Sequence, residues 1–384
     1  MFVLGLGLCE HKFALDARGS LGDVPGRTRR PRYLPSVNAS PLSPSGSGAS
    51  TARLERSDAL RTRRLARLSD ELADIGFEFV GPESLLLAIM SELDYAMRPR
   101  VHERRVPTYG AIIAPGGDRD HWQVSTQLTI TARPFPRSGL AGARLFADGL
   151  SSWVVRGVDD HHGPDASDDE LVVFDRPAGS ERDVVVLAES TGGIIVQRHP
   201  SGVVRVAGDF GVLRWDGVTW QHQPPIGDWA ATFATCTDSD QLDVVETLLE
   251  IAVHDLGSRG IGAILVYRRE RQTNGAWPTG SRYELRLATP PSLGVQRPAD
   301  LAPLVHVLAQ IDGAAVFDVD GTLRELGVRL LPDPETESAV EGFRGMRHTT
   351  ARRYSVDEPD SVVIVVSEDG PVTVMRQGRI HVGA

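Results

Sequence analysis

Lysine is almost absent from this sequence. The chain has 384 residues, and Lys12 is its one lysine beside forty arginines. Chemistry that needs a lysine, as a nucleophile or as a ligand of phosphate, is therefore excluded downstream of residue 12. We interpret the strong preference for arginine as drift in a high-GC bacterial genome.

Cysteine is also scarce. Cys9 and Cys236 are far apart in the chain and do not have metal-ligand spacing. The sequence therefore predicts neither a disulfide framework nor a zinc site. A reducing cytoplasm is the compartment that this cysteine usage favours.

Long apolar runs are missing as well. No stretch of 18 apolar residues occurs, so the sequence predicts no membrane-spanning helix. The apolar start, Met1–Leu8, is short and has no basic leading segment, which makes it a poor signal peptide. Hydrophobic residues still make up 41% of the chain. Because 384 residues exceed the roughly 100–200 of one domain, we expect two domains and a tail.

Charge is distributed unevenly. The net charge is −10, yet residues 1–67 hold twelve Lys or Arg and five Asp or Glu. The body of the chain is therefore strongly acidic, which disfavours a nucleic-acid surface because phosphate binding needs clustered basic residues. The segment Arg27–Ser50 is rich in Pro, Ser, Gly and Arg. Since such a composition buries little apolar surface, we predict a disordered tail over residues 1–67.

Residues 68–235 have the pattern of an α+β, β-rich domain. Gly81-Pro82-Glu83 marks a helix start, and the segments Tyr109–Ala114 and Trp122–Ala132 are predicted strands. Asp159–Glu170, which contains adjacent histidines, is predicted to be a solvated loop rather than a metal site. Five short β-like runs then indicate a meander: Val184–Leu187, Gly193–His199, Val203–Ala207, Val212–Trp215 and Val218–His222.

Residues 238–384 have an α/β pattern. An amphipathic helix is predicted over Asp240–Leu256, and Gly260-Ile261-Gly262-Ala263 leads into an apolar strand at Ile264–Tyr267. These glycines precede the strand, whereas a dinucleotide-binding loop follows one. The order of helix, loop and Gly-Ala-Ile strand also occurs at Glu83–Pro115, a similarity that we attribute to chance.

Three short blocks in this second region combine residues suited to nucleotide chemistry. Ile311-Asp312-Gly313-Ala314 opens a predicted strand, Arg347-His348 follows, and Ser367-Glu368-Asp369 ends the predicted strand Val362–Val366. A carboxylate can hold a divalent ion, a glycine lets the backbone approach phosphate, and alanine leaves room for a ribose. Arginine offers a planar set of donors to phosphate oxygens, and histidine adds a donor.

In order and spacing, these blocks resemble the DGA, RHR and SEE signatures of the diadenylate cyclase (DAC) family, over about the last 145 residues. The resemblance implies a C-terminal DAC-type domain with a mixed central sheet flanked by helices. Stand-alone DAC proteins often carry an unrelated N-terminal sensor domain. The resemblance therefore implies that the preceding domain is a sensor, whose ligand the sequence does not identify.

The resemblance also implies an activity. Two DAC domains meet head to head in a dimer or larger assembly, each holding one ATP, and the nucleotidyl transfer yields cyclic di-AMP and two pyrophosphates. Asp312, Arg347 and His348 are the implied catalytic residues, and Asp312 and Asp369 the implied ligands of Mg²⁺ or Mn²⁺. The implied ATP-binding residues are Gly313, Ala314, Leu331, Arg347, His348, Thr349, Ser367 and Glu368.

The chain departs from the family pattern at Met346, where threonine is usual, and at Thr349, where a second arginine is usual. Each lost bond to a charged phosphate costs about 1.5–3 kcal/mol. Arg352 or Arg353 could replace the missing guanidinium. The alternative is therefore a catalytically weak or inactive DAC-like domain that binds nucleotide as a sensor.

Another alternative comes from Asp318-Val319-Asp320-Gly321-Thr322, which matches the first motif of haloacid-dehalogenase-type phosphatases. Only 62 residues follow Thr322, and the lysine that such enzymes use is missing. We therefore predict a β-hairpin with an Asp-Gly turn at this position.

Overall fold

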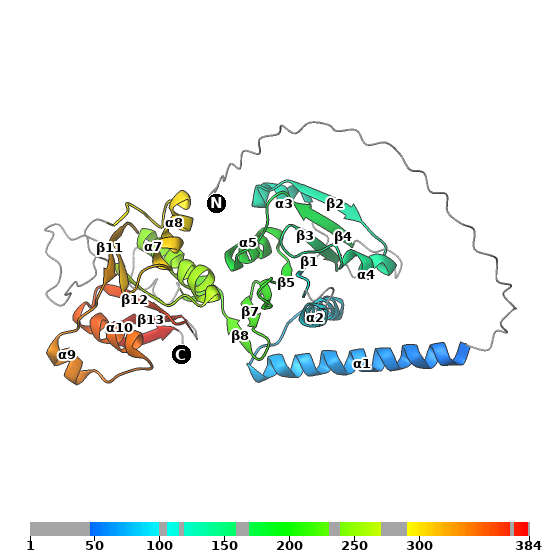
Figure 1. Ribbon diagram of the computed structural model, residues 1–384, viewed down its shortest axis with the longest axis horizontal. Coiled ribbons are helices and arrows are strands. Elements are labelled where there is room, and N and C mark those ends of the chain that lie inside the picture. Colours follow the sequence, from blue (N-terminus) through cyan, green and yellow to red (C-terminus); the bar gives the residue numbers. More distant parts are fainter. Residues whose placement is uncertain are drawn as a thin grey trace, which may run out of the picture. The chain divides into compact units, whose positions relative to one another are not determined.

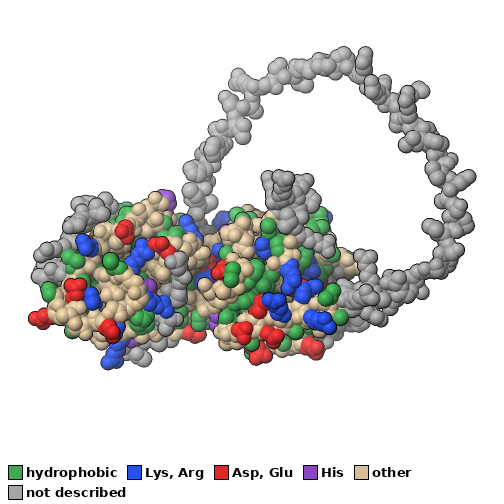
Figure 2. All heavy atoms as spheres, turned by 60° about the horizontal axis from the view of Figure 1, so that its bottom comes forward, with side chains coloured by type: hydrophobic (Ala, Val, Ile, Leu, Met, Phe, Trp, Pro, Cys, Tyr) green, Lys and Arg blue, Asp and Glu red, His purple; other side chains and the backbone are tan. Residues whose placement is uncertain are grey.

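The computed structural model describes residues 47–99, 106–114, 119–158, 169–229, 239–269, 290–368 and 372–382 (Figure 1). The described residues divide into two compact units, with the boundary between Ala66 and Arg67. Among the described residues, no helix is both long enough and apolar enough to cross a bilayer. Acidic, basic and apolar side chains are interspersed over the face drawn in Figure 2.

We predicted disorder over residues 1–67, but the last third of this segment is helical. Helix α1 spans Ser47–Asp74. The last proline of the tail is Pro44, and the residues after it are mostly Ala, Leu, Arg and Glu, which favour helix. Leu68 and Leu72 are buried against the core that follows. The earlier part of the tail lies outside the described residues.

The N-terminal domain contains an eight-stranded sheet in the order β2-β4-β3-β1-β5-β6-β7-β8. Strands β1 and β3 are parallel, and the other neighbours are antiparallel. The elements in chain order are α2 (Glu83–Met97), β1 (Tyr109–Ala114), α3 (Arg119–Thr126), β2 (Ile130–Pro134), η1 (Arg137–Gly139), α4 (Leu140–Ala143), β3 (Ser152–Gly157), β4 (Glu170–Phe174), α5 (Glu181–Thr191), β5 (Ile194–Arg198), β6 (Val204–Gly208), β7 (Gly211–Trp215) and β8 (Trp220–Gln223).

Two strand predictions in this domain were wrong. Val184–Leu187 belongs to α5, because Ser180 and Asp183 form a capping box and Gly192 ends the helix at φ +60°. Part of Trp122–Ala132 is helix α3, since Trp122 and Thr126 lie one turn apart and are both buried. The helix start at Glu83, strand β1 and the later strands of the meander were predicted correctly. The acidic loop lies mostly outside the described residues.

The C-terminal domain is built on a six-stranded sheet in the order β11-β10-β9-β12-β13-β14. Strands β9 and β10 are parallel, and the other neighbours are antiparallel. The elements are α7 (Ser239–Glu250), the π-helix η2 (Ile251–Leu256), η3 (Gly257–Arg259), β9 (Ala263–Arg268), α8 (Pro298–Leu308), β10 (Ala314–Phe317), β11 (Leu323–Val328), α9 (Pro334–Ala339), α10 (Met346–Asp357), β12 (Ser361–Val366), β13 (Thr373–Arg376) and β14 (Arg379–Val382).

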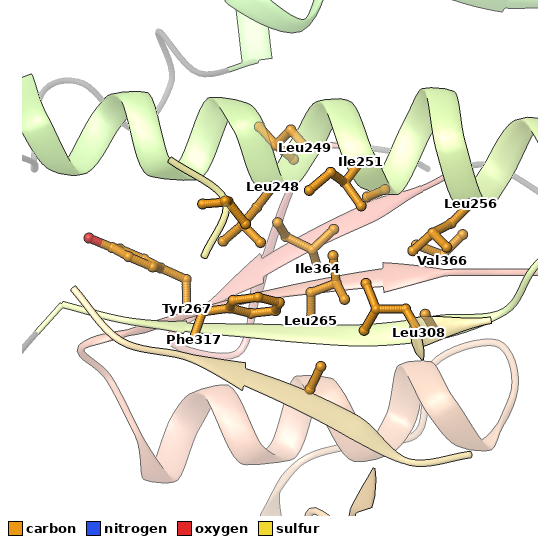
Figure 3. Packing of buried hydrophobic residues seen from close by; sticks show 14 of the residues in the cluster. Leu248, Leu249, Ile251, Leu256, Leu265, Tyr267, Leu308, Phe317, Ile364 and Val366 are labelled. Carbon is orange, nitrogen blue, oxygen red and sulfur yellow. The ribbon is translucent and has the colours of Figure 1, made fainter. Parts of the chain in front are cut away.

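Helices cover both faces of this sheet. Leu248 of α7, Leu256 of η2 and Leu308 of α8 pack on one face, with Leu265 of β9 beneath them (Figure 3). Helix α10 packs on the other face through Ala351 and Tyr354. Strand β12, Ser-Val-Val-Ile-Val-Val, is buried throughout, as its unbroken apolar sequence leads one to expect. The fold is therefore α/β with a mixed central sheet, as predicted, and it follows a β-rich α+β domain.

Candidate functional site

Three charged side chains from distant parts of the C-terminal domain meet at one edge of its sheet. Nη1 of Arg347 lies 2.8 Å from Oε1 of Glu368, and Nη2 lies 3.9 Å from Oδ1 of Asp312. Arg347 belongs to the first turn of α10, Asp312 comes just before β10, and Glu368 comes just after β12. We call Asp312, Arg347 and Glu368 the Asp312 cluster.

The strand order explains why these residues meet. Strand β9 lies between β10 and β12. Because β10 is parallel to β9, both strands begin at the same edge, and because β12 is antiparallel to β9, it ends there. Asp312 and Glu368 therefore lie on either side of Gly262, the residue before β9.

Gly262 leaves the space that Arg347 occupies at this edge, and a side chain there would displace it. A Cβ added to it would overlap the guanidinium of Arg347 and would lie 3.0 Å from Cγ of Glu368. We did not predict Gly262 as a site residue, although the Gly-Ile-Gly-Ala sequence was recognised. A glycine directly before a buried strand is the sequence signal for such a close approach.

The Asp312 cluster is open to solvent. The side chains of Asp312, Arg347 and Glu368 are 92%, 41% and 59% exposed. Exposed ion pairs of this kind contribute little stability, about 0–1 kcal/mol, because water screens them. The arginine can therefore exchange its carboxylate partners for the oxygens of a bound phosphate at small cost.

The predicted Asp-Gly-Ala block is divided between the cluster and the core. Oδ1 of Asp312 accepts a hydrogen bond from the amide of Gly313 at 2.9 Å. Gly313 has φ +99°, and a Cβ there would lie 2.9 Å from the carbonyl carbon of Gly327 in β11. Ala314 is buried in the core beneath α10. Gly313 and Ala314 thus let β10 begin close to β11 and leave Asp312 at the surface.

His348 and Thr349 do not join the cluster. His348 is 6% exposed, and its Nε2 lies 3.3 Å from Oγ1 of Thr373 in β13. Burial, then the charges of Arg344 and Arg347, lower the pKa of His348, which favours the neutral imidazole. Thr349 accepts a hydrogen bond from the amide of Phe343 at 3.0 Å. Both residues therefore attach the first turn of α10, which carries Arg347, to neighbouring segments of the domain.

The structure places the remaining predicted residues as follows. Leu331 and Ser367 are half-buried, after β11 and β12 respectively, and Asp369 lies outside the described residues. Arg352 and Arg353 do not replace the missing guanidinium of the family pattern. Each donates to backbone carbonyl oxygens, Arg352 to Gly378 at 3.0 Å and Arg353 to Val340 at 3.1 Å.

A metal site of three protein ligands does not occur within the described part of the chain. Asp312 nevertheless has the chemistry that a divalent ion requires, since it is an exposed carboxylate with one oxygen not engaged by Gly313. An ion held there would need further oxygen ligands from elsewhere, and the phosphates of a nucleotide are such ligands.

The Asp318–Thr322 segment is a hairpin turn between β10 and β11, as predicted. The amide of Gly321 donates to the carbonyl of Asp318 at 2.8 Å, and the amide of Asp318 donates to the carbonyl of Thr322 at 3.0 Å. Arg324 forms ion pairs with the carboxylates of Asp318 and Asp320. The phosphatase-like motif is thus part of a turn in the sheet.

A second group of charges joins the N-terminal and C-terminal domains. Glu181, at the start of α5, is buried and binds Arg214 of β7, while Oε1 also lies 2.9 Å from Nδ1 of His254 in η2. Arg182 lies 2.8 Å from both Glu250 and Asp255. No sequence signal pointed to this contact, because its partners are about 70 residues apart in the chain.

The pKa values in this group reflect burial and pairing. Burial by itself would raise the pKa of Glu181, but hydrogen bonds and charge from Arg214, aided by His254, outweigh it and bring the pKa to about 2. At Asp255 burial prevails over Arg182, and its pKa is raised. Glu181 is therefore a carboxylate whose ionised form the fold stabilises.

Two family models match the chain. Residues 66–223 match the probable sensor domain DACNK, and residues 250–380 match the DisA bacterial checkpoint controller nucleotide-binding domain, DAC. No curated protein matches the chain.

Two solved structures show a local likeness. One is a hypothetical membrane spanning protein from Bacillus cereus, with 16% identity, a TM-score of 0.29, and coverage of 41% of this chain and 70% of that one. The other is a double mutant of DacA from Staphylococcus aureus, with 19% identity, a TM-score of 0.27, and coverage of 37% and 87%. At such low TM-scores neither likeness carries an argument.

The matched segments cover both folded parts of the chain, and the second one contains the whole Asp312 cluster. This arrangement agrees with the family resemblance of the three sequence blocks. The chain belongs to the diadenylate cyclase family and has the organisation of its stand-alone members, a DACNK sensor domain followed by a DAC domain.

Proposed function

We propose that the chain is an active diadenylate cyclase, which condenses two ATP into cyclic di-AMP and two pyrophosphates. The observation that carries the proposal is the Asp312 cluster, in which Arg347 lies between two exposed carboxylates at an open edge of the DAC sheet. ATP is the substrate, and the N-terminal domain regulates the reaction through a ligand that is still to be identified. The proposed compartment is the cytoplasm.

The reaction needs two DAC domains placed head to head, each holding one ATP. The 3′-hydroxyl oxygen of each ribose forms a bond to the α-phosphorus of the other nucleotide. The bond from that phosphorus to the bridging oxygen of the β-phosphate breaks, and pyrophosphate leaves with the electron pair. Repeating this step in the second direction closes the ring. The proton of each attacking hydroxyl passes to Asp312 and then to water, so atoms and charge balance without any other reactant.

Each residue of the cluster has a role in this proposal. Arg347 binds the phosphates, because its planar guanidinium presents paired donors to phosphate oxygens. Asp312 accepts the proton of the attacking hydroxyl, and Glu368 orients Arg347 through their 2.8 Å ion pair. Positioning of the two nucleotides supplies most of the rate enhancement, since no covalent step by a side chain is needed.

A divalent cation, Mg²⁺ or Mn²⁺, fits the exposed carboxylate of Asp312, with Asp369 as a second proposed ligand. When bound, such an ion neutralises charge on the triphosphate. His348 fixes the first turn of α10, which carries Arg347, since its imidazole is buried against Thr373.

The test is to incubate the purified chain with ATP and either Mg²⁺ or Mn²⁺ and to separate the products by chromatography. We expect cyclic di-AMP from the wild type and a loss of at least 100-fold in Asp312→Asn, because the proton acceptor and metal ligand is removed. Asp320→Asn, in the hairpin turn, is the matched control and should retain activity. ATP consumption without cyclic di-AMP in either metal would overturn the proposal.

A second candidate function is nucleotide binding without cyclisation. Met346 is 85% exposed beside Arg347 and offers no hydrogen bond, and Thr349 is already engaged with Phe343. Fewer phosphate contacts than in the family pattern could leave binding intact and slow the chemistry. ATP bound at equilibrium, with no product after prolonged incubation in both metals, would favour this candidate.

A further inference from the structure

The N-terminal sheet repeats the topology of the DAC sheet. Six of its strands, β4-β3-β1-β5-β6-β7, correspond in order and direction to β11-β10-β9-β12-β13-β14. In both sets the one parallel pair lies at the same position, β1 with β3 and β9 with β10. On its other side, β1 has the antiparallel partner β5, and β9 has the antiparallel partner β12.

The helices repeat the pattern as well. Helix α2 precedes β1 and packs on one face of its sheet together with Leu140 of α4. Helices α7 and α8 flank β9 in the same order and share one face of theirs. Helix α5 packs on the opposite face, as α10 does in the DAC domain. The segment of α3 and β2, together with the added strand β8, is what distinguishes the N-terminal domain.

The Gly-Ala-Ile sequence found at both β1 and β9 sets the alignment of the two central strands, and the strand registers extend it to their neighbours. Ile112 of β1 lies opposite Val155 and Ile195, and Ile264 of β9 lies opposite Ala314 and Val365. On this alignment Gly110-Ala111-Ile112 occupies the position of Gly262-Ala263-Ile264, and Ile112 and Ile264 both lie on the face that α5 or α10 covers. The shared topology therefore offers an explanation other than chance for this sequence similarity: the two segments occupy equivalent places in the two sheets.

The correspondence extends to the site residues. Two residues before Val155 is Trp153, so Trp153 stands where Asp312 stands. Continuing β5 in the same register, Arg198 occupies the position of Glu368. In the first turn of α5 the buried residue is Glu181, near Arg205 of β6, just as buried His348 lies beside Thr373 of β13.

The Asp312 cluster next to Gly262 is open to solvent, whereas the equivalent space next to Gly110 is filled by protein. A Cβ at Gly110 would lie 2.5 Å from Cε3 of Trp153 and would overlap the backbone of Gly149. Trp153 is fully buried, in contrast to the exposed Asp312. Gln197, also fully buried, donates to the carbonyls of Gly149 at 2.6 Å and Ala178 at 3.0 Å, which holds this cover in place.

We infer that the N-terminal domain is a second copy of the cyclase fold whose nucleotide site is closed by Trp153. Each chain then supplies one ATP site, at the Asp312 cluster, and the N-terminal domain acts without binding ATP at the equivalent position. The statement about the Asp312 cluster rests on the proposed function, whereas the closure of the N-terminal site does not.

One experiment tests the stoichiometry. An ATP analogue with a methylene bridge between the α- and β-phosphates is titrated calorimetrically into the full chain, Arg347→Ala and the control Trp215→Phe. We expect one analogue per chain for the wild type and the control, and at least 10-fold weaker binding in Arg347→Ala. A second analogue per chain, or one that binds Arg347→Ala as tightly as the wild type, would overturn the inference. No binding to the wild type would overturn the proposed function instead.

A second measurement tests the closure itself, whatever the titration shows. The six tryptophans are replaced by 5-fluorotryptophan, and the ¹⁹F resonance of Trp153 is assigned with Trp153→Phe. We expect no shift of this resonance between H₂O and D₂O and none on adding the analogue. A solvent shift at Trp153 would mean that the site is open, and the inference would fail. The resonance of Trp215, which is only partly buried, should show a solvent shift and serves as the control.

Discussion

Nδ1 of His254 lies 2.9 Å from Oε1 of Glu181, and this hydrogen bond joins the DAC domain to the domain before it. A carboxylate only accepts, so the proton of this bond lies on Nδ1. His254 and Asp255, the two DAC residues of η2 in this contact, belong to a π-helix, a conformation that often marks functional positions. The next strand, β9, begins directly after Gly262, which lies against Arg347 and Glu368 of the Asp312 cluster.

Reversing one charge of this contact should uncouple the domains. In Arg182→Glu, attraction to Glu250 and Asp255 becomes repulsion, and the double variant Arg182→Glu/Asp255→Arg restores one pair. We expect a coupling energy of about 1 kcal/mol in the double-mutant cycle. Calorimetric unfolding should give one transition for the wild type, two for the single variant and one for the double variant.

The exposed histidine His306 of α8 provides the control for this contact. His306→Ala should leave the calorimetric transition of the wild type unchanged, whereas His254→Ala should split it. If Arg182→Glu unfolds in the same single transition as the wild type, the contact does not couple the domains.

Glu181 makes the stability depend on acid pH. Its pKa in the folded protein is about 2, against an ordinary 4.5. A lowered pKa stabilises the folded state above about pH 4.5, and this contribution is lost as the pH falls toward 2. The loss is on the order of 3 kcal/mol. Urea unfolding between pH 7 and pH 2.5 should show a steeper decline in the wild type than in Glu181→Gln, and parallel declines would contradict it.

Gly262→Ala should impair the site more than the fold. The added methyl group would meet the flexible end of Arg347, which can move away at the cost of its place between Asp312 and Glu368. We expect binding of ATP at least 10-fold weaker and a melting temperature within a few degrees of the wild type. Gly345→Ala is the matched control, because nothing lies within 4 Å of a Cβ at that position.

Arg347→Ala should weaken ATP binding by roughly 10- to 100-fold, the loss of a bond worth about 1.5–3 kcal/mol to a charged phosphate. Arg347→Lys should recover only part of it, since an ammonium cannot present paired donors. Equilibrium titration measures both, with Arg324→Ala as an exposed arginine control in the same domain. Equal affinity for ATP in Arg347→Ala and the wild type would show that Arg347 does not bind the nucleotide.

Glu92→Ala should destabilise the N-terminal domain strongly. Glu92 is fully buried, pairs with Arg144 and Arg156, and accepts a hydrogen bond from Tyr109. Removing it leaves two partly buried guanidinium groups without that partner, a cost of about 3–5 kcal/mol. The free energy of unfolding in urea measures this, and the exposed Glu78→Ala should change it by less than about 0.5 kcal/mol. A similar small change in Glu92→Ala would contradict the prediction.

Local patterns were enough for much of the DAC domain. The period of Leu248, Leu249 and Ala252 predicted the helix above the sheet, and the apolar run Val362–Val366 predicted β12, because both reflect burial that repeats along the chain. Local patterns gave the wrong prediction at Val184–Leu187, which is helical. There a capping box and a terminal glycine outweighed the preference of valine for strands.

The sequence by itself determined the candidate residues Asp312, Arg347 and Glu368 and the order in which their strands and helix follow. Only the tertiary structure decided that they meet over Gly262, because that depends on which strands are neighbours and in which direction they run. The tertiary structure likewise decided that Trp153 packs on Gly110 and that Glu181 binds His254. Pairing between distant segments leaves no periodic trace in either one, so no local pattern could have predicted these contacts.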